Sequence, residues 1–154
     1  MLISLTCIAN SHTMLGRNEQ ASNMLRGVYS GRVRLNGEEH EDTIIAALNY
    51  ATSLASLRRF EEAKSLLCKT IPVERRVQRG VDENTLRLRW NYARALREAD
   101  GATLDDLREA LTTLEETAPI ARRVLGSSHP LALSIENYLQ DAHDSVRARE
   151  ASRA

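Results

Sequence analysis

The sequence predicts an all-α fold in which antiparallel helix pairs stack into a solenoid, with about three pairs and one capping helix. Three observations support this prediction. Of the 154 residues, 42% are hydrophobic, whereas only 7 are Gly and 3 are Pro, a composition typical of helical proteins. Apolar residues recur at helical spacing along most of the chain. Similar segments also recur at a fixed step, as they do in stacked repeats.

The segments LNYATSL, at residues 48–54, and WNYARAL, at residues 90–96, show the repeat most clearly. They share Asn-Tyr-Ala and lie one 42-residue step apart, and Thr43 and Thr85 fall in the same register. Further along the chain the step lengthens to 47 residues, because EADGATLDD at residues 98–106 contains an insertion. We therefore expect repeat units of two helices each at about residues 1–36, 43–79 and 85–125.

Two apolar stripes in each unit predict its two helices. In the middle unit, Ile44, Leu48 and Ala51 fall on one face of the first helix. Ala63 and Leu67 fall on one face of the second helix. The corresponding residues of the third unit are Leu86, Trp90 and Ala93, followed by Leu107, Leu111 and Leu114.

Capping residues mark the expected helix ends. Thr103, followed by Asp105 and Asp106, is expected to start a helix, because its hydroxyl can accept a backbone hydrogen bond and the carboxylates suit the positive end of the helix dipole. Pro72 and Pro119 occupy the same position in two second helices. Each removes a backbone hydrogen bond, so we expect a shared bend. The expected stops of the second helices are Gly37, Gly80 and Gly126.

The last expected helix, at residues 130–149, carries one apolar stripe and one charged face, as a capping helix does. Residues 1–150 are therefore expected to form one domain, and residues 150–154 a frayed tail. The N-terminal end has no such cap. We expect it either to continue from further repeats or to be covered by a partner, which includes a second copy of the chain.

Composition and charge argue against several classes of partner. Lys and Arg together number 21, as do Asp and Glu, so the net charge of zero argues against nucleic-acid binding through bulk charge. No apolar run approaches the roughly 20 residues of a membrane-spanning helix. The two cysteines are too few for a disulfide framework, which favours a reducing, cytoplasmic location.

The residues that usually carry catalysis or bind metals form no recognisable pattern in this sequence. The four histidines belong to no HExxH motif, and no Cys-x-x-Cys pair occurs. Adjacent carboxylates such as Glu61 and Glu62 point in different directions on a helix. His40 and His129 share one repeat position before a first helix, where a capping contact is expected. We therefore expect a protein that is not an enzyme and that needs no metal or cofactor.

Several motifs resemble the tetratricopeptide repeats (TPRs) of kinesin light chains, whose units carry L-G-x-x-H-P-x-T-L, then N-x-L-A, then E-E-A. LGSSHPLAL at residues 125–133 is a close match, and NGEEHEDTI at residues 36–44 is followed by LNYA and FEEA. NTLRLRWNYA at residues 84–93 is a third match. The resemblance covers nearly the whole chain. It implies a TPR α-solenoid that binds a peptide in its concave groove.

In this repeat class the first helices line the concave surface. Ala51 and Ala93 are then expected against the neighbouring helix, and Asn49 and Asn91, two residues earlier, are expected to face the groove. An asparagine amide offers both a donor and an acceptor, which suits the backbone of an extended peptide. The expected backbone-binding residues are Asn10, Asn49, Asn91 and Asn137.

Arginines add positive charge to the expected groove. Arg87, Asn91 and Arg94 share one helix face, with Arg97 nearby. A guanidinium binds a carboxylate through two hydrogen bonds, so we expect an acidic or C-terminal-carboxylate peptide here. The alternative is a solvated face with local ion pairs. Trp90, between the arginines, is expected in the core.

These observations favour a non-enzymatic interaction module that binds an extended, acidic peptide in its groove. The alternative is a structural, self-associating repeat element within a larger scaffold or regulatory protein. A regulatory fragment of a catalytic protein is a third possibility.

Overall fold

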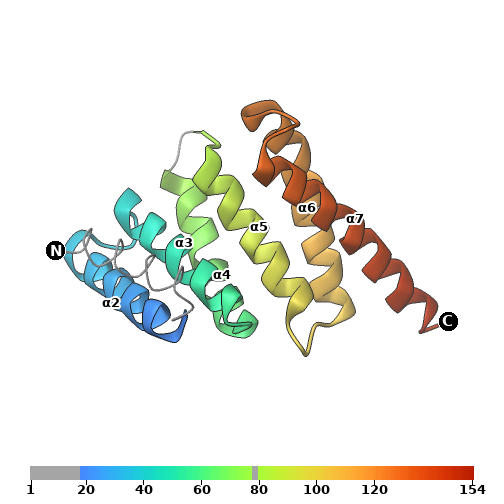
Figure 1. Ribbon diagram of the computed structural model, residues 1–154, viewed down its shortest axis with the longest axis horizontal. Coiled ribbons are helices and arrows are strands. Elements are labelled where there is room, and N and C mark those ends of the chain that lie inside the picture. The colour runs from blue at the N-terminus through green and yellow to red at the C-terminus, as the bar shows by residue number, and fades with distance from the viewer. Residues whose placement is uncertain (1–17, 78–79) are drawn as a thin grey trace. The chain divides into compact units, whose positions relative to one another are not determined.

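In the computed structural model, residues 18–77 and 80–154 are described, and all regular elements among them are α-helices (Figure 1). This confirms the all-α prediction. The N-terminal part of the first expected repeat, including Asn10, lies outside the described residues. The helices are α2 (Asn18–Asn36), α3 (Glu41–Ser56), α4 (Phe60–Val77), α5 (Glu83–Glu98), α6 (Leu104–Leu125) and α7 (Pro130–Ala151).

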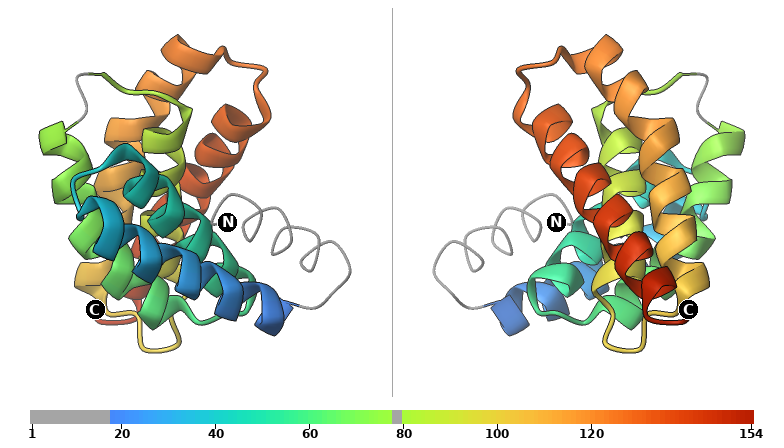
Figure 2. Two further views of the ribbon diagram at one scale, coloured as in Figure 1. Left: turned by 90° about the vertical axis from the view of Figure 1, so that its left-hand side faces the viewer. Right: turned by 90° about the vertical axis from the view of Figure 1, so that its right-hand side faces the viewer.

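The chain divides into two compact units, Met1–Arg79 and Gly80–Ala154. In the first unit α3 packs against α2 and α4, and in the second α6 packs against α5 and α7. Both views in Figure 2 show α6 and α7 running in opposite directions side by side. Each unit therefore consists of consecutive helices that pack as antiparallel neighbours, as the sequence predicts.

The start of α6 confirms the expected cap at Thr103. The Thr103 hydroxyl oxygen accepts a hydrogen bond from the Asp106 amide at 3.1 Å. In return, the Asp106 carboxylate accepts one from the Thr103 amide at 2.9 Å. This reciprocal pair satisfies two amide groups that have no partner within the helix.

The two histidines at one repeat position cap helices in the same way. His40 Nδ1 accepts a hydrogen bond from the Asp42 amide, and His129 Nδ1 accepts one from the Leu131 amide, both at 3.1 Å. Each histidine follows a glycine with positive φ by three residues, at +81° for Gly37 and +91° for Gly126. The repeat seen in the sequence therefore returns as the same turn and the same cap.

The predicted apolar stripes form the core. In the first unit, Ala21 and Leu25 of α2 pack with Met24 and Tyr50. In the second unit, Leu114 of α6 is fully buried between residues of α5 and α7. Burying one such side chain stabilises the fold by about 1.5–3 kcal/mol. The larger cluster comprises Leu86, Ala93, Leu96, Ala110, Leu114, Ala118, Ala121, Leu131, Ala132, Ile135 and Ala142.

Pro72 and Pro119 lie inside α4 and α6, as predicted. Two residues before each proline is a buried threonine. Thr70 donates its hydroxyl hydrogen to the Leu66 carbonyl at 2.9 Å, and Thr117 donates to the Thr113 carbonyl at 2.6 Å. Both second helices therefore share a Thr-x-Pro feature in which the hydroxyl is satisfied within the helix. The bend expected at the prolines stays a prediction.

α7 continues to Ala151, two residues past the expected end of the capping helix. The expected grouping of all helices into one domain of repeats stays a prediction. Across residues 18–77 and 80–154, no helix combines the length and apolar character that a membrane crossing needs.

Candidate functional site

The residues expected to bind a peptide are distributed over both units. Asn49 is half-buried on α3 of the first unit. In the second unit, Arg87 on α5 and Asn137 on α7 are exposed, and Arg94 on α5 is half-buried. Asn91 is only 2% exposed, so it is less accessible to a peptide than the other described residues of the set. Asn10 and the N-terminal end, where a partner or second copy is expected, lie outside the described residues.

Arg87 forms a local ion pair on the surface of α5. Its Nη2 lies 2.7 Å from Glu83 Oε1, one helical turn earlier. Both side chains are about half exposed, so water and salt screen this pair. The sequence left open that these arginines form a solvated face with local ion pairs instead of a peptide site. Arg87 has such a local ion pair.

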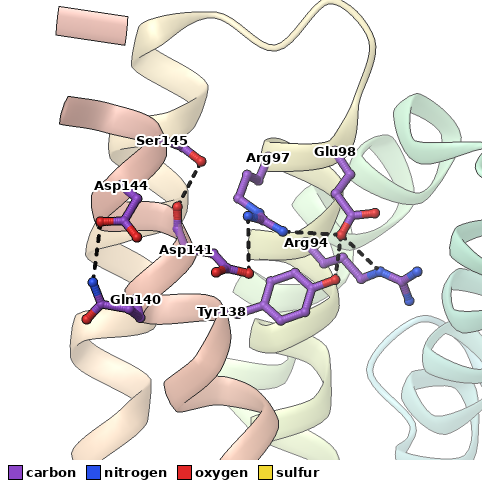
Figure 3. A network of polar contacts seen from close by, with 8 residues as sticks. All are labelled: Arg94, Arg97, Glu98, Tyr138, Gln140, Asp141, Asp144 and Ser145. Carbon is purple, nitrogen blue, oxygen red and sulfur yellow. Dashed lines mark hydrogen bonds and ion pairs between the residues drawn. The ribbon is translucent and has the colours of Figure 1, made fainter. Parts of the chain in front are cut away.

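The structure brings Arg94, Arg97 and Glu98 of α5 together with Tyr138 and Asp141 of α7 (Figure 3). The Tyr138 hydroxyl donates to Glu98 Oε1 at 2.5 Å. The same carboxylate oxygen lies 3.7 Å from Arg94 Nε and 3.6 Å from Arg97 Nη2. We call these five residues the arginine–tyrosine cluster.

Within the cluster, Arg97 lies across an aromatic ring. Its guanidinium carbon is 4.7 Å from the centre of the Tyr138 ring, an attractive cation–π arrangement. Arg97 Nη1 also lies 3.6 Å from the Asp141 carboxylate. The Tyr138 ring in turn meets Trp90 edge to face, with 5.8 Å between ring centres. Trp90 packs against the core cluster, as expected from the sequence.

The cluster changes the acidity of its tyrosine. Burial raises the pKa of the Tyr138 hydroxyl, and the hydrogen bond to Glu98 and the negative charge of Glu98 raise it further. The positive charges of Arg94 and Arg97 act in the opposite direction. Tyr138 therefore remains a neutral hydrogen-bond donor at ordinary pH.

Charge in the arginine–tyrosine cluster is balanced. Arg94 and Arg97 carry two positive charges, and Glu98 and Asp141 carry two negative ones. The sequence analysis singled out the arginines but missed both carboxylates and Tyr138. Glu98 lies four residues after Arg94, a spacing that places the two on one helix face and could have been found. Tyr138 lies 40 residues from Glu98, so only the packing of α7 on α5 reveals that contact.

The insertion noticed in the sequence shapes a cavity beside the cluster. The α5–α6 connection has five residues, 99–103, whereas the α3–α4 connection has three, 57–59. A cavity of about 420 Å³ lies at the longer connection. Its lining includes Arg97 and Arg149 as well as Asp100, so charges of both signs border it. Among the described residues, no group of three or more His, Cys, Asp or Glu could hold a metal ion.

Comparison with known proteins places these features in a family. The tetratricopeptide repeat profile matches residues 1–76, and a second tetratricopeptide repeat profile matches residues 102–131. A search of curated proteins found no match.

Solved structures share the fold. Nearly identical TPR-like repeats of a Podosopora anserina protein described as a kinesin light chain are 18% identical to this chain, with a TM-score of 0.57, and the match covers 99% of this chain and 90% of that one. A point variant of those repeats is 19% identical to this chain, with a TM-score of 0.57. That match covers 99% of this chain and 95% of the variant. BtubC (BKLC) from P. vanneervenii is 15% identical, with a TM-score of 0.52, and 97% of this chain and 63% of that one are covered.

The two profile matches together cover more than half of the chain, and the helical fold is that of the solved repeats. The chain belongs to the tetratricopeptide repeat family, with a fold like that of kinesin light chain repeats.

Proposed function

We propose that this TPR protein binds an extended peptide with acidic side chains, and that the arginine–tyrosine cluster holds one of the peptide's carboxylates. Tetratricopeptide repeats are protein-interaction or scaffold modules, which supports a protein partner. The acidic character of the peptide is inferred from the arginines. The peptide would lie along α5 and α7, beside Arg87 and Asn137. Asn49, on the first unit, stays a separate prediction.

The main support for this proposal is the way in which the Arg97 guanidinium is paired. Its side chain is 19% exposed, and both of its ion pairs are 3.6 Å long. Arg97 Nε is buried and has no hydrogen-bond acceptor among the described residues. A charge-assisted hydrogen bond from a guanidinium to a carboxylate is shorter, at about 2.7–2.9 Å, and is often formed in pairs. Neither of these pairs therefore has the two-point geometry of which a guanidinium is capable, and a ligand carboxylate can bind Arg97 in that geometry.

Arg97 is also held in place before any ligand arrives. The Tyr138 ring lies under the guanidinium, and Glu98 and Asp141 flank it on two sides. A side chain that is already ordered loses less conformational entropy on binding than a free one. This order favours recognition of a carboxylate at a defined position.

Binding of a fluorescein-labelled, glutamate-rich peptide, followed by fluorescence anisotropy, tests the proposal. We expect Arg97→Lys to weaken binding about 10-fold or more, because lysine keeps the charge but loses the two-point geometry. Arg123→Ala is the matched control. Arg123 is exposed on α6 and has no ion pair among the described residues, so its loss should change affinity little.

Two further variants test the residues expected from the sequence. Arg94→Ala should weaken binding without lowering the melting temperature. Asn91→Ala should also weaken binding if the peptide backbone reaches that amide. Wild-type affinity in both Arg97→Lys and Arg94→Ala would rule out this site. Absence of binding to any acidic peptide would rule out the proposed function.

A further inference from the structure

One oxygen atom in the arginine–tyrosine cluster accepts one hydrogen bond and forms two ion pairs. Glu98 Oε1 accepts the Tyr138 hydroxyl at 2.5 Å and lies 3.7 Å from Arg94 Nε and 3.6 Å from Arg97 Nη2. Figure 3 shows these contacts converging on the carboxylate from α5 and α7. The Glu98 side chain thus occupies the place between the two arginines where a ligand carboxylate would be bound.

The contacts that hold Glu98 there are unequal. The hydrogen bond from Tyr138 is short, but both arginine distances exceed those of a charge-assisted hydrogen bond. Glu98 is also the last residue of α5, where the negative end of the helix dipole disfavours a carboxylate. Its position therefore depends on Tyr138 and on charge attraction rather than on a two-point pair with either arginine.

We propose that Glu98 is an internal competitor for acidic ligands, and that a peptide carboxylate binds the arginine–tyrosine cluster by displacing it. The proposal rests on the function proposed above and concerns the regulation of that same site. In the complex, the incoming carboxylate accepts hydrogen bonds from Arg97 and Tyr138, and Glu98 turns towards water. Because Glu98 contacts both arginines and Tyr138 through a side-chain oxygen, its displacement needs only rotation about its side-chain torsions.

Asp141 is a weaker competitor than Glu98. Its side chain is 57% exposed, against 21% for Glu98, and within residues 18–77 and 80–154 its ion pair is with Arg97 alone. Glu98 contacts both arginines and the tyrosine.

Competition at the cluster also gives selectivity. A neutral side chain cannot replace the charge of Glu98, so ligands without an anionic group should not displace it.

The same labelled peptide tests the proposal with Glu98→Gln, which keeps the size of the side chain and removes its charge. If Glu98 occupies the cluster in about nine of ten molecules, its removal lowers the apparent Kd about 10-fold. Asp144→Asn is the matched control. Asp144 lies on α7 and accepts a hydrogen bond from Gln140, and it pairs with no arginine in the described part of the chain. Its replacement therefore changes net charge equally without freeing the cluster.

Glu98→Asp provides a second variant that keeps the charge. Its shorter side chain cannot hold Tyr138 and both arginines at once, so we expect a smaller gain in affinity. Circular dichroism would verify that each variant is folded. Tighter binding by both Glu98 variants than by Asp144→Asn supports the proposal.

Other outcomes separate the two proposals. Equal gains in Glu98→Gln and Asp144→Asn indicate a general effect of charge and overturn the role of Glu98. Weaker or unchanged binding in both Glu98 variants also overturns it, and the proposed function stands if Arg97→Lys still weakens binding. If neither the wild-type protein nor the Glu98 variants bind the peptide, both proposals are wrong.

Discussion

Tyr138 on α7 donates its hydroxyl hydrogen to Glu98 at the end of α5, with 2.5 Å between the two oxygens. This bond joins the first and last helices of the second unit directly. It also positions the carboxylate that lies between the two arginines. The tyrosine therefore links the stability of the unit to the state of the proposed binding site.

Replacing Tyr138 with phenylalanine should destabilise the protein. The ring and its contact with Arg97 remain, but the partly buried hydrogen bond to a charged group is lost. We expect the free energy of unfolding to fall by about 1–2 kcal/mol, measured by urea denaturation. Tyr92→Phe is the matched control, because it removes a more exposed hydrogen bond of the same kind, to Glu109. If both variants lost the same free energy of unfolding, the greater burial of the Tyr138 hydrogen bond would not contribute to stability.

Stability should fall in alkaline solution, in part through Tyr138. Burial, the hydrogen bond to Glu98 and the charge of Glu98 raise the pKa of this hydroxyl above its ordinary value of 10.0. The unfolded chain therefore loses the phenolic proton first. The stabilisation is complete below about pH 10 and is lost as the pH rises through the folded-state pKa. Urea denaturation from pH 9 to pH 11 should show a steeper loss in the wild-type protein than in Tyr138→Phe.

The cause of the raised pKa can be tested separately. In Glu98→Gln the negative charge disappears while the positive charges of Arg94 and Arg97 remain, so the pKa of Tyr138 should fall relative to the wild-type protein. Tyrosinate absorbance near 295 nm follows the titration, and Tyr138→Phe identifies the contribution of this ring. An unchanged titration would mean that burial alone raises the pKa.

Two glycines should respond to alanine in opposite directions. Gly126 ends α6 with φ +91° and ψ 151°, a conformation that a side chain disfavours. Gly126→Ala should therefore cost about 1–3 kcal/mol of unfolding free energy. Gly27 lies inside α2 with open space around it, so Gly27→Ala should stabilise by about 0.5–1 kcal/mol. Thermal unfolding compares the two, and a stabilising Gly126→Ala would contradict the backbone argument.

Leu114 should be among the most sensitive core positions of the second unit. It is 0% exposed and lies in the cluster formed by α5, α6 and α7. Leu114→Ala removes buried methyl groups and leaves a cavity, so we expect a loss of about 2–5 kcal/mol in urea denaturation. Leu133→Ala is the control at 47% exposure, and its effect should stay within about 0.5 kcal/mol.

Local features of this fold could be predicted from the sequence because local physics determines them. The spacing of Ile44, Leu48 and Ala51 predicted a buried helix face, and all three are buried. Thr103 and His129 could be identified as caps because a cap depends on residues within one turn.

The candidate site was harder to predict because it depends on how helices pack. The resemblance to repeats whose first helices line a concave surface suggested that Asn91 faces a groove. In the structure, α5 buries residues on more than one face, including Thr85, Leu88 and Ala95, and Asn91 is buried with them. Nothing within one repeat indicates that Tyr138 meets Glu98. That contact requires the register of α7 on α5.

Both histidine caps depend on the same ring nitrogen. An imidazole accepts a hydrogen bond only through a ring nitrogen that carries no proton. His40 and His129 both accept through Nδ1, whereas α5 is capped by the Asp82 carboxylate. A side chain without an acceptor at either position would thus loosen the start of α3 or of α7, one in each unit. Each unit therefore contains one helix whose first turn depends on a single nitrogen atom of a histidine side chain.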